Sequence, residues 1–246
     1  MDIYGYLHLY LKASHDWLFH RLMSPSQSDY SKCNVSCDVE RILELLGVQE
    51  DSEFLTYVRE YRLLSKILET RYSRIRLTYP ENWKIGENTS MFLYVGIREI
   101  KPKVVVETGV ANGHSTYFIL NALKRNGQGI LNSIDVKNNV GGLLSSDEKE
   151  NWGLHIIEKP MNRRKSLTMI SKNIGDIDIF IHDSVHFYYW QMFEYEIFLP
   201  KIRKGGFLLS DDVDSSYAFL DFSDRHGLVP HLLIDNSKIL GIAPVL

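Results

Sequence analysis

Glu107-Thr108-Gly109-Val110-Ala111-Asn112-Gly113-His114-Ser115 is the stretch that decides the fold of this chain. A short β-branched run, 104–106, comes before it, and a helix-length segment, 115–125, comes after it. The small residues of the stretch let the backbone approach a ligand closely, and the start of the helix offers N–H groups to an anion. The pattern therefore predicts a strand, a cofactor-binding turn and a helix.

The sequence after this turn alternates between short apolar runs and helix-length segments. Further strands are predicted at 130–134, 154–157, 177–181 and 207–209, and helices at 163–171, 186–199 and 215–226. Such alternation gives a parallel sheet with helices on both faces. Two closing strands, 228–234 and 239–245, flank a tight turn and predict an antiparallel pair at the edge of the sheet.

The first hundred residues are predicted to be helical. A capped segment at 39–46 ends at Gly47, and apolar side chains spaced three and four apart mark an amphipathic helix over about 54–75. A further helix is expected around 91–100. We therefore divide the chain into a helical region, 1–90, that caps the site or forms a dimer interface, and a cofactor-binding domain, 91–246.

The composition is that of a soluble globular protein, with 44% hydrophobic and 24% charged residues. A net charge of −3 argues against a nucleic-acid partner held by phosphate contacts. No apolar run approaches the roughly 20 residues that span a bilayer, so no membrane partner is expected. The stretch 1–12 lacks the basic region of a signal peptide, which makes the cytoplasm the expected compartment and keeps Cys33 and Cys37 reduced.

Acidic residues follow several of the predicted strands. Ligands of such sheets bind at the carboxyl ends of the parallel strands. The acids at these ends are Glu107, Asp135, Asp183, Asp211 and Asp212. Asp135 lies 22 residues after Gly113, close to the interval at which an acid reaches the ribose of a nucleotide-type cofactor. This arrangement favours a functional acidic rim over acids that only shape turns.

Three motifs of the chain resemble the class I S-adenosylmethionine-dependent methyltransferases. The stretch 107–115 looks like their first motif, E-x-G-x-x-x-G-x-S/T, and Leu-Pro-Lys-Ile-Arg-Lys-Gly-Gly-Phe-Leu-Leu-Ser-Asp-Asp-Val at 199–213 resembles their run into strand 5. Phe-Ile-His-Asp-Ser-Val-His-Phe-Tyr at 180–188 is similar to a segment of macrocin-type sugar O-methyltransferases and "cephalosporin hydroxylase"-like proteins. The resemblance covers about 91–246 and implies a Rossmann-like α/β fold with a seven-stranded sheet and an antiparallel last strand.

The same resemblance implies an S-adenosylmethionine site on the first turn. Glu107 and Gly109 would lie near the methionine part of the cofactor, and Asp135 would accept hydrogen bonds from the ribose hydroxyls. The remaining candidate cofactor contacts are Ala111, Gly113, Ser115 and Asp183.

In metal-dependent members of the superfamily, an acid after strand 4 and an acidic pair after strand 5 hold a divalent cation. The corresponding residues are Asp183, Asp211 and Asp212, and three carboxylates suit Mg²⁺ or another hard divalent cation. The strand that ends at Asp183 carries an additional residue, His182. A second interpretation therefore stays open, in which Asp183 positions the cofactor and the Asp211-Asp212 pair caps the next turn.

His186, three residues after Asp183, is the candidate general base, because a histidine of ordinary pKa accepts a hydroxyl proton near pH 7. The alternative is that it only bonds a neighbouring carboxylate. With Asp183 it makes up the expected catalytic pair. The resemblance implies methyl transfer to a hydroxyl of a small-molecule acceptor, a sugar or natural product, and allows a homodimer through the N-terminal helices.

Three other interpretations compete with methyl transfer. Thr108-Gly109 and Gly113 also fit the turn of short-chain dehydrogenases, but none of the 14 tyrosines has the lysine four residues later that this NAD(P) chemistry needs. The run 212–214, Asp-Val-Asp, matches the D-x-D of nucleotide-sugar transferases, which gives the glycine turn no function. A non-catalytic S-adenosylmethionine-binding scaffold stays open, because only turnover separates it from an enzyme.

Overall fold

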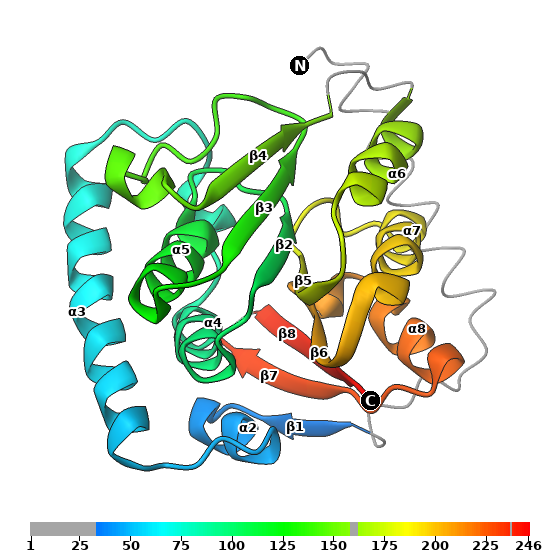
Figure 1. Cartoon of the computed structure of the whole chain (residues 1–246), viewed down its shortest axis with the longest axis horizontal. Helices are drawn as coiled ribbons and strands as arrows, with labels where there is room; N and C mark the ends of the chain where they lie inside the picture. Colours follow the sequence, from blue (N-terminus) through cyan, green and yellow to red (C-terminus); the bar gives the residue numbers. More distant parts are fainter. Residues whose placement is uncertain (1–32, 158–161, 237) are drawn as a thin grey trace.

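The structure, a computed structural model, describes residues 33–157, 162–236 and 238–246; the stretch 1–12 considered above lies outside them. Its strands are β1 (Asn34–Ser36), β2 (Val104–Thr108), β3 (Ile130–Asp135), β4 (Trp152–Ile156), β5 (Ile177–His182), β6 (Ile202–Ser210), β7 (His231–Asp235) and β8 (Lys238–Val245). They form one sheet in the order β1-β7-β8-β6-β5-β2-β3-β4 (Figure 1).

The sheet is parallel except at its last strand. β2 pairs in parallel with β3 and β5, and β5 pairs in parallel with β6. β8 runs antiparallel to both β6 and β7. This order, with a single reversed strand, confirms the Rossmann-like α/β fold and the closing antiparallel pair. The carboxyl ends of β2, β3, β5 and β6 therefore meet at one edge, where ligands of such sheets bind.

One strand was not predicted. β1 pairs in parallel with β7, from Asn34 opposite His231 to Ser36 opposite Leu233, and extends the expected seven strands to eight. The sequence analysis assigned only helices to this part of the chain, which was wrong for these three residues. A strand of three residues spans too few positions to produce a periodic pattern, so sequence periodicity could not identify it.

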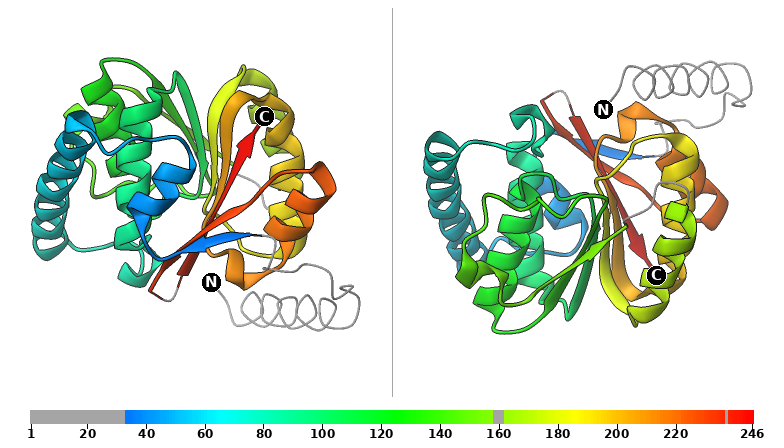
Figure 2. Two further views of the ribbon diagram at one scale, coloured as in Figure 1. Left: turned by 90° about the horizontal axis from the view of Figure 1, so that it is seen from below. Right: turned by 90° about the horizontal axis from the view of Figure 1, so that it is seen from above.

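The helices cover both faces of the sheet (Figure 2). They are α2 (Val39–Leu45), α3 (Ser52–Arg74), α4 (Glu87–Ile100), α5 (His114–Asn126), α6 (Arg163–Asn173), α7 (Tyr188–Phe198) and α8 (Ala218–His226). α4 and α5 lie on one face with α3 outside them, and α6, α7 and α8 lie on the other (Figures 1 and 2). Short 3₁₀ helices connect several elements: η2 (Glu81–Trp83), η3 (Ser146–Lys149), η5 (Leu199–Lys201) and η6 (Val213–Ser215).

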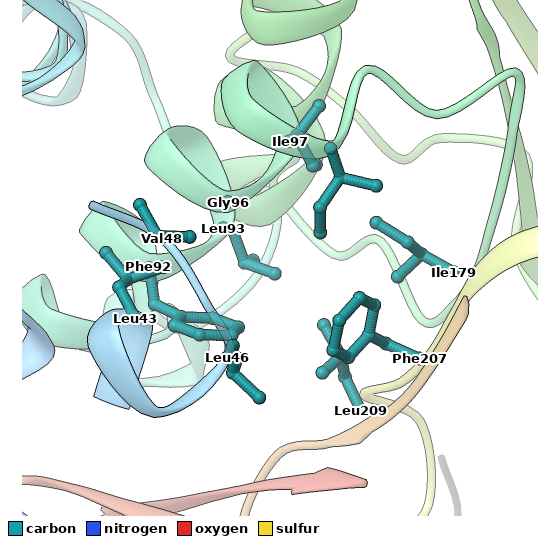
Figure 3. Close-up of a pocket in the computed structure, with 11 residues that line it drawn as sticks. Leu43, Leu46, Val48, Phe92, Leu93, Gly96, Ile97, Ile179, Phe207 and Leu209 are labelled. Carbon is teal, nitrogen blue, oxygen red and sulfur yellow. The ribbon is translucent and has the colours of Figure 1, made fainter. Parts of the chain in front are cut away.

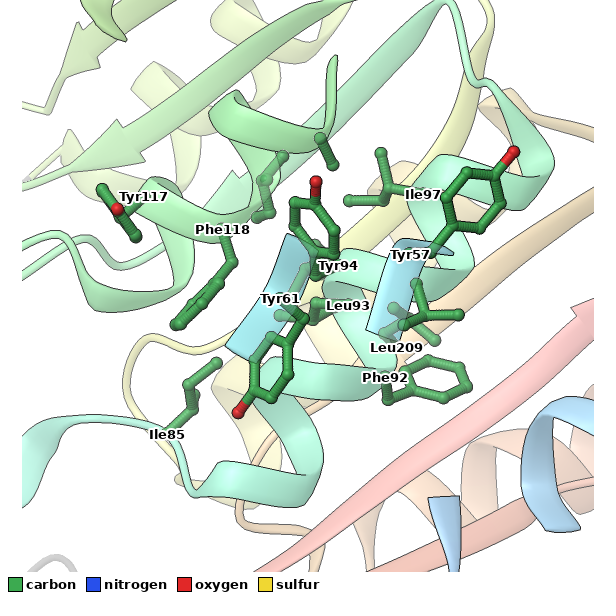
Figure 4. Packing of buried hydrophobic residues seen from close by; sticks show 14 of the residues in the cluster. Tyr57, Tyr61, Ile85, Phe92, Leu93, Tyr94, Ile97, Tyr117, Phe118 and Leu209 are labelled. Carbon is green, nitrogen blue, oxygen red and sulfur yellow. The ribbon is translucent and has the colours of Figure 1, made fainter. Parts of the chain in front are cut away.

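The N-terminal helices share their core with the sheet. Tyr61 of α3 is 4% exposed, and its ring centroid lies 6.4 Å from that of Tyr94 on α4 and 5.2 Å from that of Phe118 on α5 (Figure 4). The same buried cluster continues to Leu209 of β6. The boundary we expected between residues 90 and 91 falls inside α4, which begins at Glu87. Within the described ranges, no helix is both long and apolar enough to cross a bilayer.

Candidate active site

The turn after β2 approaches the end of β5 more closely than any side chain would allow. Gly109 has φ +88°, and a Cβ built on it would lie 1.9 Å from the backbone oxygen of Asp183. The Asp183 N–H donates to the backbone oxygen of Thr108 at 2.9 Å. Glycine at position 109 therefore lets the cofactor turn and the segment after β5 lie against each other.

Only part of the turn faces outward. Gly109 and Ala111 are partly exposed, whereas Gly113 and Ser115 are buried. The segment after β3 covers the second half of the turn, because the Gly141 N–H donates to the Ala111 oxygen at 2.9 Å. A Cβ on Gly113 would lie 3.0 Å from the Gly141 Cα. A cofactor on this turn would therefore contact residues 109–111, while Gly113 and Ser115 shape the turn from within.

Glu107 lies inside the protein and not on the surface that a cofactor would contact. It is 1% exposed, and its carboxylate accepts hydrogen bonds from the hydroxyls of Ser133 at 2.6 Å, Thr116 at 2.7 Å and Ser115 at 3.3 Å. Burial raises its pKa to about 7, although the three hydroxyls oppose that shift. Glu107 therefore fixes the turn to α5 and β3, and its expected contact with the methionine part of a cofactor stays a prediction.

Asp135, at the end of β3, is held beside the turn. One carboxylate oxygen accepts from the Val110 N–H at 3.0 Å, and the other accepts from the Lys137 N–H at 2.9 Å. The residue stays partly exposed. A carboxylate oxygen accepts more than one hydrogen bond, so both oxygens can still receive hydroxyl donors. This placement leaves the Asp135 carboxylate open to further donors, and its role as ribose acceptor stays a prediction.

The segment before α4 forms a wall next to the turn, which the sequence analysis did not identify. The Tyr79 N–H donates to Asn112 Oδ1 at 3.1 Å, and Asn112 Nδ2 donates back to the Tyr79 oxygen at 2.9 Å. The Tyr79 hydroxyl donates to Asn139 Oδ1 at 2.9 Å, and the Tyr79 ring lies 5.9 Å from that of Trp83. Tyr79 thus stands beside the candidate cofactor site, with Trp83 against its ring.

His114, inside the glycine motif, ties this site to the N-terminal helices. Its Nδ1 lies 2.9 Å from the Tyr72 hydroxyl of α3, and its Nε2 lies 3.2 Å from the Ser90 hydroxyl of α4. Burial, followed by the charge of Lys84, lowers its pKa to about 3. The ring is therefore neutral at physiological pH and serves as a partly buried hydrogen-bonding link between α3, α4 and α5.

A cluster of carboxylates with one histidine and one lysine lies at the same edge of the sheet. His186 Nε2 is 3.5 Å from Asp212 Oδ2 and 4.0 Å from Asp183 Oδ1. Lys238 Nζ is 3.3 Å from Asp211 Oδ2 and 3.4 Å from Asp212 Oδ2. The structure thus brings together the four predicted residues and adds Lys238, which the sequence analysis did not identify because a lysine next to a predicted hairpin turn is unremarkable.

Burial changes the protonation of this cluster. Burial, followed by the charge of Asp211, raises the pKa of Asp183 well above its usual value. Burial, followed by the charge of Asp212, raises the pKa of Asp211 to about 6. It lowers the pKa of His186 to about 4, with His182 as the next cause. Burial also disfavours the charged form of Lys238, but Asp211 and Asp212 outweigh it and raise the pKa. At neutral pH the histidine is unprotonated and the lysine is charged.

A fully buried pair, Glu194 and His182, packs against the histidine of the acidic cluster. Glu194, on α7, accepts from His182 Nδ1 at 2.6 Å, from Ser184 Oγ at 2.9 Å and from Thr108 Oγ1 at 2.5 Å. The ring of His182 lies edge-on to that of His186, with centroids 5.5 Å apart. The sequence analysis missed Glu194, although an acid on the buried stripe of an aromatic helix is an unusual placement that could have identified it.

Three buried polar atoms of this edge lack a hydrogen-bond partner within the part of the chain that the structure describes. They are Asp211 Oδ1, His186 Nδ1 and His182 Nε2. Buried polar groups are normally paired, so unpaired ones need an explanation. Their concentration beside the cofactor turn indicates a place where partners come from a bound molecule or from water.

A small apolar cavity of about 30 Å³ lies elsewhere, between α2, α4 and the sheet (Figure 3). Leu43, Leu93 and Phe207 are among its lining residues, and none of the lining side chains is polar or titratable. A cavity of this kind stays dry and supplies no chemistry. The carboxyl edge of the sheet therefore remains the candidate active site.

Comparison with known protein families gives a match over the middle of the chain. Residues 106–213, which include the glycine turn and the acidic cluster up to Asp212, match the family model described as a methyltransferase domain. A comparison with curated proteins gives no match.

Similar solved structures share the fold over most of the chain. A methyltransferase from Geobacter sulfurreducens is 15% identical, with 85% of this chain and 97% of that chain covered and a TM-score of 0.53. The O-methyltransferase TomG from Streptomyces achromogenes, involved in tomaymycin synthesis and solved with S-adenosylmethionine, is 13% identical, with 84% and 96% covered and a TM-score of 0.50. An O-methyltransferase from Bacillus cereus is 10% identical, with 94% and 97% covered and a TM-score of 0.50. At these identities the similarity establishes the fold.

Proposed function

Because the chain carries a methyltransferase domain of the class I fold, we propose that it transfers a methyl group from S-adenosylmethionine to a hydroxyl group of a small molecule. The observation that carries this proposal is the direct contact between the two halves of the site. Gly109 of the cofactor turn lies against the backbone of Asp183, whose side chain belongs to the acidic cluster. A methyl donor on the turn would therefore face the residues that can handle the acceptor's proton.

The residues of the turn fit this cofactor. Gly109 and Ala111 are partly exposed in the turn before α5, and Asp135, which accepts from the Val110 N–H, is partly exposed beside that turn. Bound there, S-adenosylmethionine supplies an electrophilic methyl group on a sulfonium. The protein's task is then to hold the acceptor oxygen in line with that methyl group and to remove its proton.

His186 is the residue proposed to take the proton. Its ring is three-quarters buried and unprotonated at neutral pH, and Asp212 lies 3.5 Å from Nε2. As the acceptor oxygen forms its bond to the methyl carbon, the bond from carbon to sulfur breaks and the sulfonium becomes a neutral thioether. The hydroxyl proton passes to His186 Nε2, and the Asp212 carboxylate, 3.5 Å away, stabilises the resulting imidazolium.

The divalent cation implied by the family resemblance does not fit the cluster as it stands. In the described ranges, no three or more carboxylate, histidine or cysteine side chains are arranged to hold a metal ion. The ammonium group of Lys238 lies within 3.4 Å of both Asp211 and Asp212. We therefore derive no step of the reaction through a metal.

A sugar or natural-product hydroxyl is the acceptor class that we propose, and the aromatic wall of Tyr79 and Trp83 supports it. Trp83 is 57% exposed, its ring lies 5.9 Å from that of Tyr79, and Tyr79 is hydrogen-bonded to Asn112 of the turn. Aromatic rings near a polar site suit an acceptor with an apolar face and hydroxyl groups. A homodimer through α3 is consistent with the exposed apolar side chains of Leu55, Leu63 and Ile67 on that helix.

The test combines cofactor binding with turnover. The purified protein is incubated with S-adenosylmethionine labelled in its methyl group and with a panel of hydroxylated acceptors, and Kd for the cofactor is measured by calorimetry. We expect Asp135→Asn to weaken cofactor binding about 10-fold or more, since hydrogen bonds to a charged group contribute ~1.5–3 kcal/mol. His186→Asn should reduce turnover about 100-fold or more while Kd stays unchanged.

His226→Asn on α8 is the matched control for His186→Asn and should leave both quantities unchanged. Cofactor binding without turnover on any acceptor would favour a scaffold, and absence of cofactor binding would contradict the proposal as a whole.

A further inference from the structure

Lys238 is placed so that its side chain reaches the acidic cluster. It begins β8 and pairs with Asp235 of β7 across the tight connection between the two strands. Its Nζ lies 3.3 Å from Asp211 Oδ2 and 3.4 Å from Asp212 Oδ2, and only 20% of its side chain is exposed. The ammonium group thus bridges two of the three carboxylates that the sequence analysis assigned to a divalent cation.

The cluster requires positive charge. Asp211 is 1% exposed, and its side chain stands next to those of Asp212 and Asp183. Carboxylates that share a poorly solvated site repel one another unless a cation neutralises them. Lys238 supplies that cation from within the chain, and a metal ion cannot bind the same carboxylate oxygens while the ammonium group occupies the space between them.

We propose that Lys238 is the resident cation of the acceptor site and replaces the divalent ion of the metal-dependent enzymes. An ammonium group has three N–H donors. Two are directed to Asp211 and Asp212, and the third is offered to the acceptor oxygen.

This inference rests on the proposed methyl transfer. As the acceptor hydroxyl gives its proton to His186, negative charge develops on the oxygen and Lys238 stabilises it; that charge is used up when the oxygen forms its bond to the methyl carbon. Preorganised donors of this kind lower the barrier because they need not reorient during the reaction.

The first experiment measures metal binding and needs no acceptor. Mn²⁺ is added to the full-length protein and followed by electron paramagnetic resonance and calorimetry. We expect no binding to the wild type at millimolar Mn²⁺. Lys238→Met keeps a side chain of similar length, removes the charge and frees the carboxylates, so this variant should bind Mn²⁺. Lys204→Met, an exposed lysine on β6, is the matched control and should behave as the wild type.

The second experiment measures turnover. The wild type should keep its full rate in excess EDTA and gain nothing from added Mg²⁺. Lys238→Met should lose about 100-fold or more in kcat while Kd for S-adenosylmethionine changes less than about 3-fold, as expected for loss of one preorganised donor. Lys238→Arg keeps the charge and should retain more of the rate than Lys238→Met.

Wild-type Mn²⁺ binding together with EDTA-sensitive turnover would overturn the proposal, and so would an unchanged rate in a folded Lys238→Met variant. If the wild type methylates none of the acceptors, the proposed function fails at that point. The metal-binding comparison still decides whether Lys238 excludes a divalent ion, and the wild-type measurement does not depend on whether a variant folds.

Discussion

Gly109 is the residue at which the cofactor turn meets the acidic cluster, because its missing side chain lets the turn lie on the backbone after β5. We predict that Gly109→Ala destabilises the protein by about 2 kcal/mol or more. The methyl group would be placed 1.9 Å from the Asp183 oxygen, at a φ of +88° that residues with side chains rarely adopt. Denaturant unfolding gives the free energy, and calorimetry should show weaker binding of S-adenosylmethionine.

Gly142→Ala is the control, since no atom lies within 4 Å of a Cβ at that position. It should change the free energy of unfolding by less than about 1 kcal/mol. Equal effects of the two substitutions would show that the close approach at Gly109 has no energetic role.

His114 makes the stability of the protein depend on pH. Burial lowers its pKa in the folded state from 6.5 to about 3. Between these values the unfolded chain binds a proton that the folded chain does not, so His114 makes the protein less stable as the pH falls. The contribution between pH 8 and pH 5 is about 2 kcal/mol.

His114→Gln keeps hydrogen-bonding atoms near Tyr72 and Ser90 but does not titrate. The wild type should exceed this variant in unfolding free energy by more at pH 8 than at pH 5, as measured by urea unfolding at both values. Parallel pH profiles would contradict the assignment of a neutral ring to His114.

Sequence reasoning worked best for residues whose chemistry depends on their position after a strand. Asp183, His186, Asp211 and Asp212 were expected at one edge, and the structure places them there because parallel strands end on the same side. Glu107 also lies near the end of a parallel strand, but its side chain points into the protein, where three hydroxyl groups donate hydrogen bonds to it. The direction of a side chain at a strand end depends on packing, which the sequence pattern does not reveal.

Among elements, α3 and the segment that covers the cofactor turn are joined by one ion pair. Arg71 binds Glu148 through both of its terminal nitrogens, at 2.6 and 3.0 Å, and also donates to the Leu143 oxygen at 2.8 Å. The Glu148 side chain is only 6% exposed. Removing the arginine therefore leaves a nearly buried carboxylate without its cation.

We predict that Arg71→Met lowers the unfolding free energy by about 3 kcal/mol and weakens binding of S-adenosylmethionine, because η3 and residues 140–144 hold the turn in place. Thermal unfolding and calorimetry measure the two effects. Lys66→Met, on an exposed position of the same helix, should change neither. An effect on stability with unchanged cofactor affinity would separate this segment from the cofactor site.

The elements themselves were largely predictable after residue 100, where apolar runs and helix signals alternate clearly. α5 begins at His114 and β5 ends at His182, within a residue of the expected limits. The start of α7 was placed two residues early, since His186 precedes the helix that begins at Tyr188. The contact between Lys238 and the acidic cluster depends on strand order, a long-range property that no local pattern contains.

At the scale of the whole molecule, the N-terminal helices and the sheet have one continuous core. Buried side chains of α3, α4, α5, β5, β6, β7 and β8 belong to a single cluster on this face. Two regions that share a core lose it together, so the helical region and the sheet with its flanking helices should unfold in one cooperative transition. The regions before and after residue 90 would then differ in sequence pattern but would not fold as separate units.

Tyr61→Ala tests this cooperativity, because Tyr61 is 4% exposed between α4 and α5 and donates a hydrogen bond to the Glu87 oxygen at 2.9 Å. The substitution should cost about 3–5 kcal/mol, the usual range for a buried aromatic side chain. The fluorescence of Trp83 reports on the N-terminal part, and that of Trp190 reports on the opposite face of the sheet. Two versions of the protein, each keeping one of these tryptophans, should show the same denaturation midpoint. Tyr61→Ala should lower that midpoint equally in both.

Leu63→Ala, on a 56% exposed position of α3, is the control and should shift the midpoint little. If the Trp83 signal were lost at lower denaturant than the Trp190 signal, the N-terminal helices would be an independent cap. The hydrogen bond between Tyr72 and His114 would then not stabilise the cofactor turn. Coincident transitions would instead mean that substitutions far from the active site, on the outer helix, reduce cofactor binding through the shared core.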